Sequence, residues 1–297
     1  MKKIFLAVLV MLAFAAGFVS QAAAADSIYD EVKEKGLIRV GHGTDVPPLS
    51  FIDPKDGELK GFDIDIIDAM VKQISEMMGK ELKKEMVVVN NKTRIAFLAN
   101  RRIDMTVRSM SHTRSRDEEI DYAEPPYLWT GKIFYAKKGK FKSPLDICGK
   151  KMAVTQGSNA YLAGQDYLKE LGCKEDFQIL SFQNNAECFL ALKQGKVDAY
   201  VQDGPIIAGV AGSEGVDYEA VGPIFSPGLY GIGVPPNDSK WRDTASFALQ
   251  DMIANGTYEK IYQKWFGPNG LAPLPNNARP RLPEDVYGDL NQFVWPR

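Results

Sequence analysis

The sequence predicts an α/β protein of two lobes, and three observations lead to this prediction. Short apolar strands alternate with amphipathic helices from residue 37 to residue 266, which is the pattern of βαβ units with parallel sheets. Two Gly/Pro-rich segments, residues 124–131 and 227–231, interrupt this alternation. The chain of 297 residues is also long enough for two domains at ~150 residues each. We therefore expect a first lobe at residues 26–128 and 227–297, and a second lobe at residues 129–226.

Residues 1–25 are predicted to be a secretory signal peptide that belongs to neither lobe. Lys2 and Lys3 supply a positive start, an apolar run covers residues 4–19, and residues 23–25 form a small-residue cleavage pattern. A membrane anchor is the alternative, but the run is short for a span of ~20 residues. We therefore expect export to the periplasm, where a disulfide can form.

The first lobe is predicted from its helix at residues 62–78, whose apolar residues share one face and which ends at Gly79. The other expected elements of this lobe are strands at residues 37–42, 86–89 and 103–107 and a short helix at residues 93–100. Binding loops are expected at the carboxyl ends of such strands.

The second lobe is predicted from a renewed β/α series. Its expected strands lie at residues 133–136, 151–154, 178–182 and 197–201, and its helices at residues 159–171 and 186–193. The chain then returns through a strand-like segment at 231–234, helices at 238–254 and 257–266, and a surface tail at 270–297. Two crossings between lobes predict a cleft with two hinge strands at its base, an arrangement suited to hinge closure.

Composition excludes several classes of function. Lys and Arg number 36 and Asp and Glu number 38, so the net charge of -2 argues against a nucleic-acid partner. Two histidines and three cysteines cannot assemble a zinc cluster at the usual spacing, and we expect no metal and no cofactor. Asp63 and Asp65 form an Asp-x-Asp pattern, but they open a helix, where the helix dipole favours negative charge.

Several motifs occur in an order that resembles one known family. Residues 61–66 read GFDIDI and are followed by Met70, Val71 and Ile74, and this pattern resembles the signature of the family 3 periplasmic amino-acid-binding proteins, the receptors of ABC uptake systems. Further segments resemble the same family in its order: residues 94–104, 109–122, 150–158, 197–203 and 255–267. The resemblance implies the type II periplasmic binding protein fold, in which two β-α lobes are joined by two hinge strands. It also implies a small amino-acid ligand and a membrane permease as partner, and we expect a monomer.

The resemblance also implies how the two charges of an amino acid are held. Arg116 matches the family residue that binds the ligand carboxylate, and a guanidinium can donate two parallel bonds to that group. Ser109 and Ser111 match positions that add donors to it, and Asp203 matches the second-lobe acid that binds the ammonium. Only a closed form then satisfies both charges, so the ligand favours closure. The alternatives are a surface charge for Arg116 and a helix N-cap before Gly204 for Asp203.

The choice of ligand side chain is less determined by the sequence. Arg94 and Arg108 lie near the matched loops, and relatives that bind acidic amino acids or glutamine use an Arg matching Arg94. This chain has Gly43 where acidic-amino-acid receptors place another Arg, and Val46 where many glutamine and basic-amino-acid receptors place an aromatic residue. The polar side chains expected on the far side of the pocket are those of Asn90, Asn91, Gln156, Ser158, Asn159, Asn185 and Gln202. Gly43 argues against a strictly acidic ligand and Val46 against the glutamine and basic types of receptor. The arginine, amide and hydroxyl groups together predict a polar ligand of the glutamine, glutamate, asparagine or aspartate type.

Cys148 and Cys173 match positions that are disulfide-bonded in some relatives. A bond closing a loop of ~25 residues would stabilise the second lobe by about 3 kcal/mol in the chain-entropy model. Cys188 is expected to be a buried free thiol.

Two other functions remain open at this point. Exported cyclohexadienyl (arogenate/prephenate) dehydratases resemble these receptors, but such an enzyme needs a general acid in the cleft and the sequence offers no strong candidate. A sensory ectodomain is the other possibility, and the sequence does not separate it from an uptake receptor.

Overall fold

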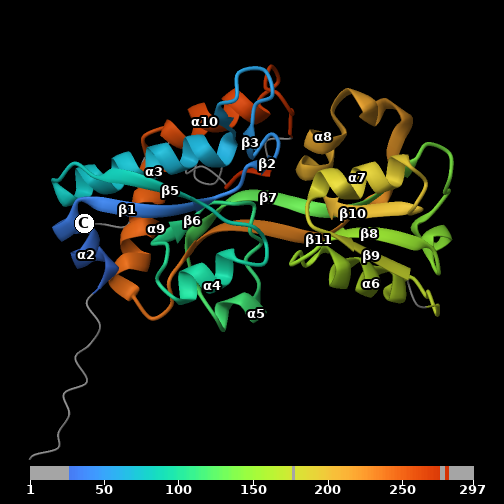
Figure 1. Cartoon of the computed structure of the whole chain (residues 1–297), viewed down its shortest axis with the longest axis horizontal. Coiled ribbons are helices and arrows are strands. Elements are labelled where there is room, and N and C mark those ends of the chain that lie inside the picture. The colour runs from blue at the N-terminus through green and yellow to red at the C-terminus, as the bar shows by residue number, and fades with distance from the viewer. Residues whose placement is uncertain (1–26, 176–177, 275–277, 281–297) are drawn as a thin grey trace, which may run out of the picture.

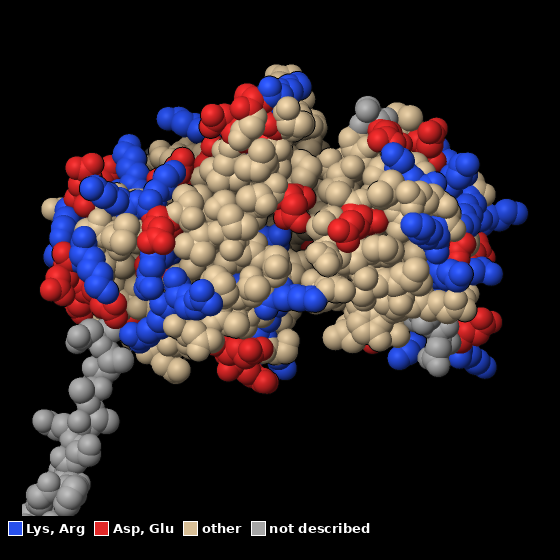
Figure 2. Space-filling view, viewed as in Figure 1, with Lys and Arg blue, Asp and Glu red and all other residues tan. Residues whose placement is uncertain are grey.

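The computed structural model describes residues 27–175, 178–274 and 278–280 and has two α/β lobes (Figure 1). The predicted signal peptide and most of the predicted tail lie outside these residues. Eight strands form one mixed sheet that runs through both lobes in the order β5-β1-β6-β11-β7-β10-β8-β9. The molecular surface is indented where the lobes meet, and each lobe carries charged residues of both signs on the face shown (Figure 2).

The first lobe is built on the parallel strands β1 (Leu37–His42), β5 (Lys83–Val88) and β6 (Met105–Thr106). A small second sheet contains β2 (Asp45–Val46), β3 (Ser50–Ile52) and β4 (Leu59–Lys60). The helices of this lobe are α2 (Ile28–Lys35), α3 (Phe62–Met78), α4 (Arg94–Ala99), α5 (Arg114–Asp117), α9 (Ser239–Ala254) and α10 (Thr257–Phe266).

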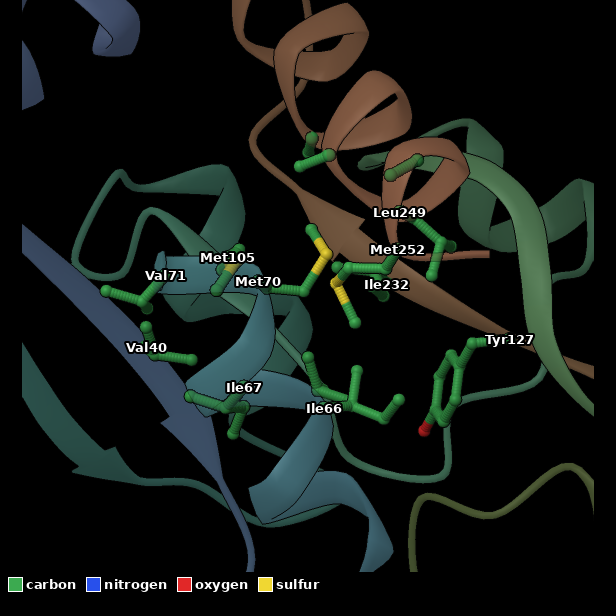
Figure 3. Packing of buried hydrophobic residues seen from close by; sticks show 14 of the residues in the cluster. Val40, Ile66, Ile67, Met70, Val71, Met105, Tyr127, Ile232, Leu249 and Met252 are labelled. Atoms are coloured by element: carbon green, nitrogen blue, oxygen red, sulfur yellow. The ribbon is translucent and has the colours of Figure 1, made fainter. Parts of the chain in front are cut away.

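The core of the first lobe forms around α3, as the spacing of its apolar residues predicts. Ile67, Met70 and Val71 point from α3 toward the strand residues Val40 and Met105, while α9 contributes further apolar side chains to the same core (Figure 3). Helix α3 ends at Gly79, which adopts the left-handed conformation with φ 61°. The burial of this face fixes the helix N-terminus, and therefore Asp63, beside the loops that follow the strands.

The second lobe contains the parallel strands β8 (Lys151–Thr155), β9 (Gln178–Phe182) and β10 (Ala199–Asp203). Helix α6 (Ala160–Glu170) packs on one side of the sheet, and α7 (Asn185–Lys193) and α8 (Gly204–Ala211) belong to a separate apolar cluster. The 3₁₀ helices Pro144–Ile147 and Gly212–Asp217 complete this lobe. The disulfide between Cys148 and Cys173 is confirmed, and Cys188 is a buried free thiol.

Two long antiparallel strands connect the lobes: β7 (Asp121–Lys137) and β11 (Tyr218–Val234). The expected strands at 133–136 and 231–234 are therefore only the ends of much longer strands, and the Gly/Pro-rich segments do not interrupt them. The register between β7 and β11 shifts opposite Pro125 and Pro126, because proline has no N–H to donate to the ladder. The lobe boundaries at 128/129 and 226/227 fall inside these strands and stay a prediction.

In the part of the chain that the structure describes, no helix has the length and apolar character needed to cross a membrane.

Candidate functional site

A small pocket lies between residues of the two lobes. All the residues that we assigned to the site line it, whereas Asn90 and Gln156, which we placed among the possible polar side chains, do not. Contact of the lining residues with a ligand stays a prediction. Two more lining residues are Asn185, which we had placed among the possible polar side chains, and Ile206, which the sequence analysis missed. The complete lining is Asn91, Arg94, Arg108, Ser109, Ser111, Arg116, Ser158, Asn159, Asn185, Gln202, Asp203 and Ile206.

Three buried guanidinium groups form the first-lobe side of the pocket. Arg94, on the first turn of α4, donates from Nη1 to the backbone oxygen of Arg108 at 2.6 Å. Arg116, on α5, donates from Nη1 to the backbone oxygen of Ser111, also at 2.6 Å. With 8% of its surface exposed, Arg116 is not the surface charge of our alternative interpretation. Arg94 and Arg116 are therefore both held by a backbone oxygen, and both line the pocket.

Arg108 is held by two side chains of its own lobe. Its Nη1 donates to Oδ1 of Asn91 at 2.7 Å, and its Nη2 donates to Oδ1 of Asp45 at 2.9 Å. A Cβ atom at Gly43 would lie 2.7 Å from the Nε of Arg108, so a side chain at this position would have to displace the guanidinium group. The glycine at position 43, which we treated as a departure from the acidic-amino-acid receptors, makes room for another guanidinium.

The arginine cluster has fewer acceptors than donors. Among the described residues, the buried Nε atoms of Arg94 and Arg108 have no hydrogen-bond partner. Burial lowers the pKa of Arg94 well below its usual value, and repulsion from Arg116 and Arg108 lowers it further. Because three guanidinium groups line this side of the pocket, it is suited to an anionic ligand group.

A buried carboxyl group supports the serine loop behind the arginines. Asp63 accepts hydrogen bonds from the Ser109 N–H at 3.1 Å and from the Tyr127 hydroxyl at 3.0 Å. Burial raises the pKa of Asp63 to about 7, although these hydrogen bonds lower it. Ser109 has φ 39°, a left-handed conformation that is uncommon for serine, and the bond to Asp63 holds it there. Asp63 therefore supports the serine loop in addition to its predicted interaction with the helix dipole. Its position in the sequence could not show this second role.

The second lobe contributes uncharged donors and acceptors. The Oδ1 atom of Asn185, at the start of α7, accepts from Thr155 Oγ1 at 2.7 Å, Tyr200 Oη at 2.8 Å and Gln202 Nε2 at 3.0 Å. Because three donors occupy this oxygen, the amide Nδ2 of Asn185 is left to donate toward the pocket. Asn159 precedes α6 without a side-chain cap hydrogen bond, so its amide is also free of that role.

Asp203 lies at the end of β10, where both of its carboxylate oxygens accept from protein donors. Tyr230 Oη donates to Oδ2 at 2.8 Å, and Lys132 Nζ lies 3.3 Å from Oδ1. Asp203 occupies the N-cap position of α8, but its side chain makes no cap hydrogen bond, so the capping alternative is wrong for the side chain. The sequence analysis missed Lys132. The one sequence feature that could have identified it is the presence of a lysine in an otherwise apolar strand segment.

Close contacts between the lobes show that the pocket is closed. A Cβ atom at Gly209 of α8 would lie 1.7 Å from the backbone oxygen of Pro47, and one at Gly157 would lie 2.9 Å from that of Asn91. A Cβ atom at Gly228 of β11 would lie 3.4 Å from Ser111 Oγ and 3.5 Å from Asp203 Oδ1. Ser111 and Asp203 therefore face the same small space, although they come from different lobes.

Within the described ranges, no group of three or more His, Cys, Asp or Glu residues is arranged to hold a metal ion.

Comparison with known proteins adds independent evidence. A family model described as bacterial extracellular solute-binding proteins, family 3, matches residues 38–268. A glutamine-binding protein of an ABC transporter from Bacillus subtilis is 34% identical over 236 residues, which are 79% of this chain and 82% of that protein. These relatives are solute-binding proteins rather than enzymes.

Two solved structures agree with the fold. An ancestral arginine-binding protein bound to arginine has 34% identity and a TM-score of 0.68, covering 78% of this chain and 99% of its own. An ancestral amino-acid-binding protein, described as a precursor of cyclohexadienyl dehydratase, has 29% identity and a TM-score of 0.68, covering 81% of this chain and 99% of its own. The two-lobed fold is therefore that of the type II periplasmic amino-acid-binding proteins.

Proposed function

Because the chain belongs to the bacterial extracellular solute-binding proteins of family 3, we propose that it captures a free polar L-amino acid and delivers it to an ABC-transporter permease. The proposed ligands are glutamine, glutamate, asparagine and aspartate. The proposed site of action is the periplasm, and the proposed working form is a monomer. The family and the B. subtilis relative support the general role of amino-acid binding for an ABC transporter.

The observation that carries the proposal is the meeting of opposite charges from different lobes at one closed pocket. Arg116 lines it from the first lobe and Asp203 from the second. In the proposed complex the ligand carboxylate accepts from Arg116, Ser109 and Ser111, and the ligand ammonium donates to Asp203. The lobes must close for both ends to be bound, so the ligand stabilises the closed state by its differential affinity for it.

The ligand side chain would extend toward the remaining polar groups. Arg94 and Arg108 offer guanidinium donors from the first lobe, and Asn185 offers an amide donor from the second. Amide and carboxylate side chains both accept from such donors.

Isothermal titration calorimetry against the common amino acids tests this function. We expect one or a few ligands with a micromolar or lower Kd, equivalent to about -8 kcal/mol or better. Arg116→Ala should abolish binding without changing the circular dichroism spectrum. Arg242→Ala is the matched control, because Arg242 is half-buried, lies outside the pocket lining and pairs with the adjacent Asp243. Normal binding by Arg116→Ala would refute the assignment of the anchor.

A second candidate is an exported cyclohexadienyl dehydratase, which the likeness to the dehydratase precursor favours. Such an enzyme needs a positioned general acid. The one carboxyl group in the pocket lining is that of Asp203, which pairs with Lys132. Turnover of prephenate or arogenate by the purified protein would replace the binding function by this one.

A further inference from the structure

We propose that Lys132 makes the pocket selective for an acidic amino acid, with a net charge of -1, because its ammonium group neutralises Asp203 from inside the protein. The inference rests on the proposed function and goes further by naming the charge class of the ligand. It assigns to Lys132 a positioning role, since this residue is not part of the pocket lining.

Lys132 is a buried counterion of Asp203. The two residues are directly paired across the antiparallel strands β7 and β10, so their side chains leave the sheet side by side. Lys132 has 0% of its surface exposed, and Nζ lies 3.3 Å from Asp203 Oδ1. A buried ammonium requires a paired anion, because its desolvation is otherwise uncompensated. The negative charge of Asp203 is therefore already balanced by Lys132 in the ligand-free protein.

The remaining charges around the pocket leave an excess of positive charge. Asp45 pairs with Arg108, but neither Arg94 nor Arg116 forms an ion pair with a carboxylate among the described residues. Asp63 lies behind the cluster with a pKa of about 7, so at neutral pH it supplies only part of a negative charge. With Asp203 neutralised by Lys132, a zwitterion without net charge leaves this excess uncompensated.

The unpartnered guanidinium atoms provide a second, independent indication. The Nε atoms of Arg94 and Arg108 are buried and lack hydrogen-bond partners in the part of the chain that is described, and both residues line the pocket. Both guanidinium groups are therefore incompletely hydrogen-bonded within the protein. A second ligand carboxylate can accept from the guanidinium groups of the pocket lining through either oxygen, whereas a side-chain amide offers one acceptor oxygen and brings an NH₂ group that has to face other donors. The arrangement is therefore suited to glutamate or aspartate more than to glutamine or asparagine.

The test is calorimetry at one fixed pH with glutamate, aspartate, glutamine and asparagine. The wild-type protein should bind its best acidic ligand at least tenfold more tightly than the matching amide. In Lys132→Gln the new amide still donates to Asp203 but carries no charge, so this preference should fall at least tenfold. Lys132→Arg should restore it. Lys140→Met is the control, since Lys140 pairs with Asp198 on the surface of the same lobe and should leave the preference unchanged.

Each result has one meaning. If none of the amino acids binds the wild-type protein, the proposed function fails. If ligands bind but glutamine or asparagine is preferred, or if Lys132→Gln keeps the wild-type preference, the function stands and the role of Lys132 is refuted. The wild-type ranking needs no variant, so the inference can be overturned even where the substitution at position 132 prevents folding.

Discussion

Gly209 provides the sharpest test of whether closure and ligand binding are coupled. An alanine Cβ at this position would lie 1.7 Å from the backbone oxygen of Pro47 and 3.0 Å from Cδ of Pro48. Both atoms belong to the first lobe, whereas Gly209 lies on α8 of the second. Ordinary contacts between such atoms are about 3.5 Å long, so the lobes would have to separate by roughly 1.5–2 Å at this point.

The expected cost follows from overpacking of a close interface, which is about 1–3 kcal/mol. Because the cost falls on the closed state, Gly209→Ala should weaken ligand binding by about 5- to 150-fold. The melting temperature of the ligand-free protein should change little, since an open form relieves the clash. Calorimetry gives the affinity, and small-angle scattering with saturating ligand should show a less compact protein than the wild type.

Gly204→Ala is the matched control. It lies on the same helix, and its Cβ would meet only the backbone oxygen of Gly131 at 4.0 Å. We expect wild-type affinity from this variant. Wild-type affinity in Gly209→Ala would show that the ligand-bound state does not need the contact between α8 and Pro47, and the coupling argument would be wrong.

Three further predictions concern single side chains. Arg116→Lys should weaken binding at least tenfold in calorimetry, because an ammonium cannot donate the two parallel bonds of a guanidinium. Gly228→Ala should weaken binding without lowering the melting temperature, since its methyl group enters the space between Ser111 and Asp203 at ordinary contact distances. His112→Gln should lower the melting temperature mainly at acidic pH: the hydrogen bond to Glu124 raises the pKa of His112 above 6.5, so its stabilisation is present below pH 6.5 and lost as the pH rises through the folded-state pKa. A melting-temperature difference that grows with pH would contradict this sign.

Local sequence patterns predicted the elements that carry their own periodicity. Helix α3 spans residues 62–78 as expected, and β1 spans residues 37–42, because each has a clear apolar pattern and a terminating glycine or turn. The two connecting strands were predicted only in part. Prolines within β7 read locally as a break, and only the pairing with β11, about a hundred residues later, shows that the strand continues.

The candidate site also contains residues that the sequence could predict and residues that it could not. Its polar lining could be predicted because the motif order in the sequence resembles a known family. Lys132 and Asp63 could not, because nothing local distinguishes a buried lysine from a surface one, or a buried carboxyl group from a helix-opening one. Their roles arise from partners 71 and 64 residues away, Asp203 and Tyr127, which only the folded chain brings into contact.

The charged groups of the two lobes differ in how far they are already paired, and this difference predicts which lobe the ligand binds first. In the first lobe neither Arg94 nor Arg116 forms an ion pair with a carboxylate among the described residues, whereas both oxygens of Asp203 in the second lobe already accept from Lys132 and Tyr230. A ligand therefore gains most electrostatic stabilisation by binding the first lobe before closure. The second lobe then adds a carboxylate that is already satisfied and the amide of Asn185, so its contribution is mainly shape and hydrogen bonding. It follows that substitutions among the arginines should slow or abolish capture, whereas those at Asn185 should speed release from the closed state.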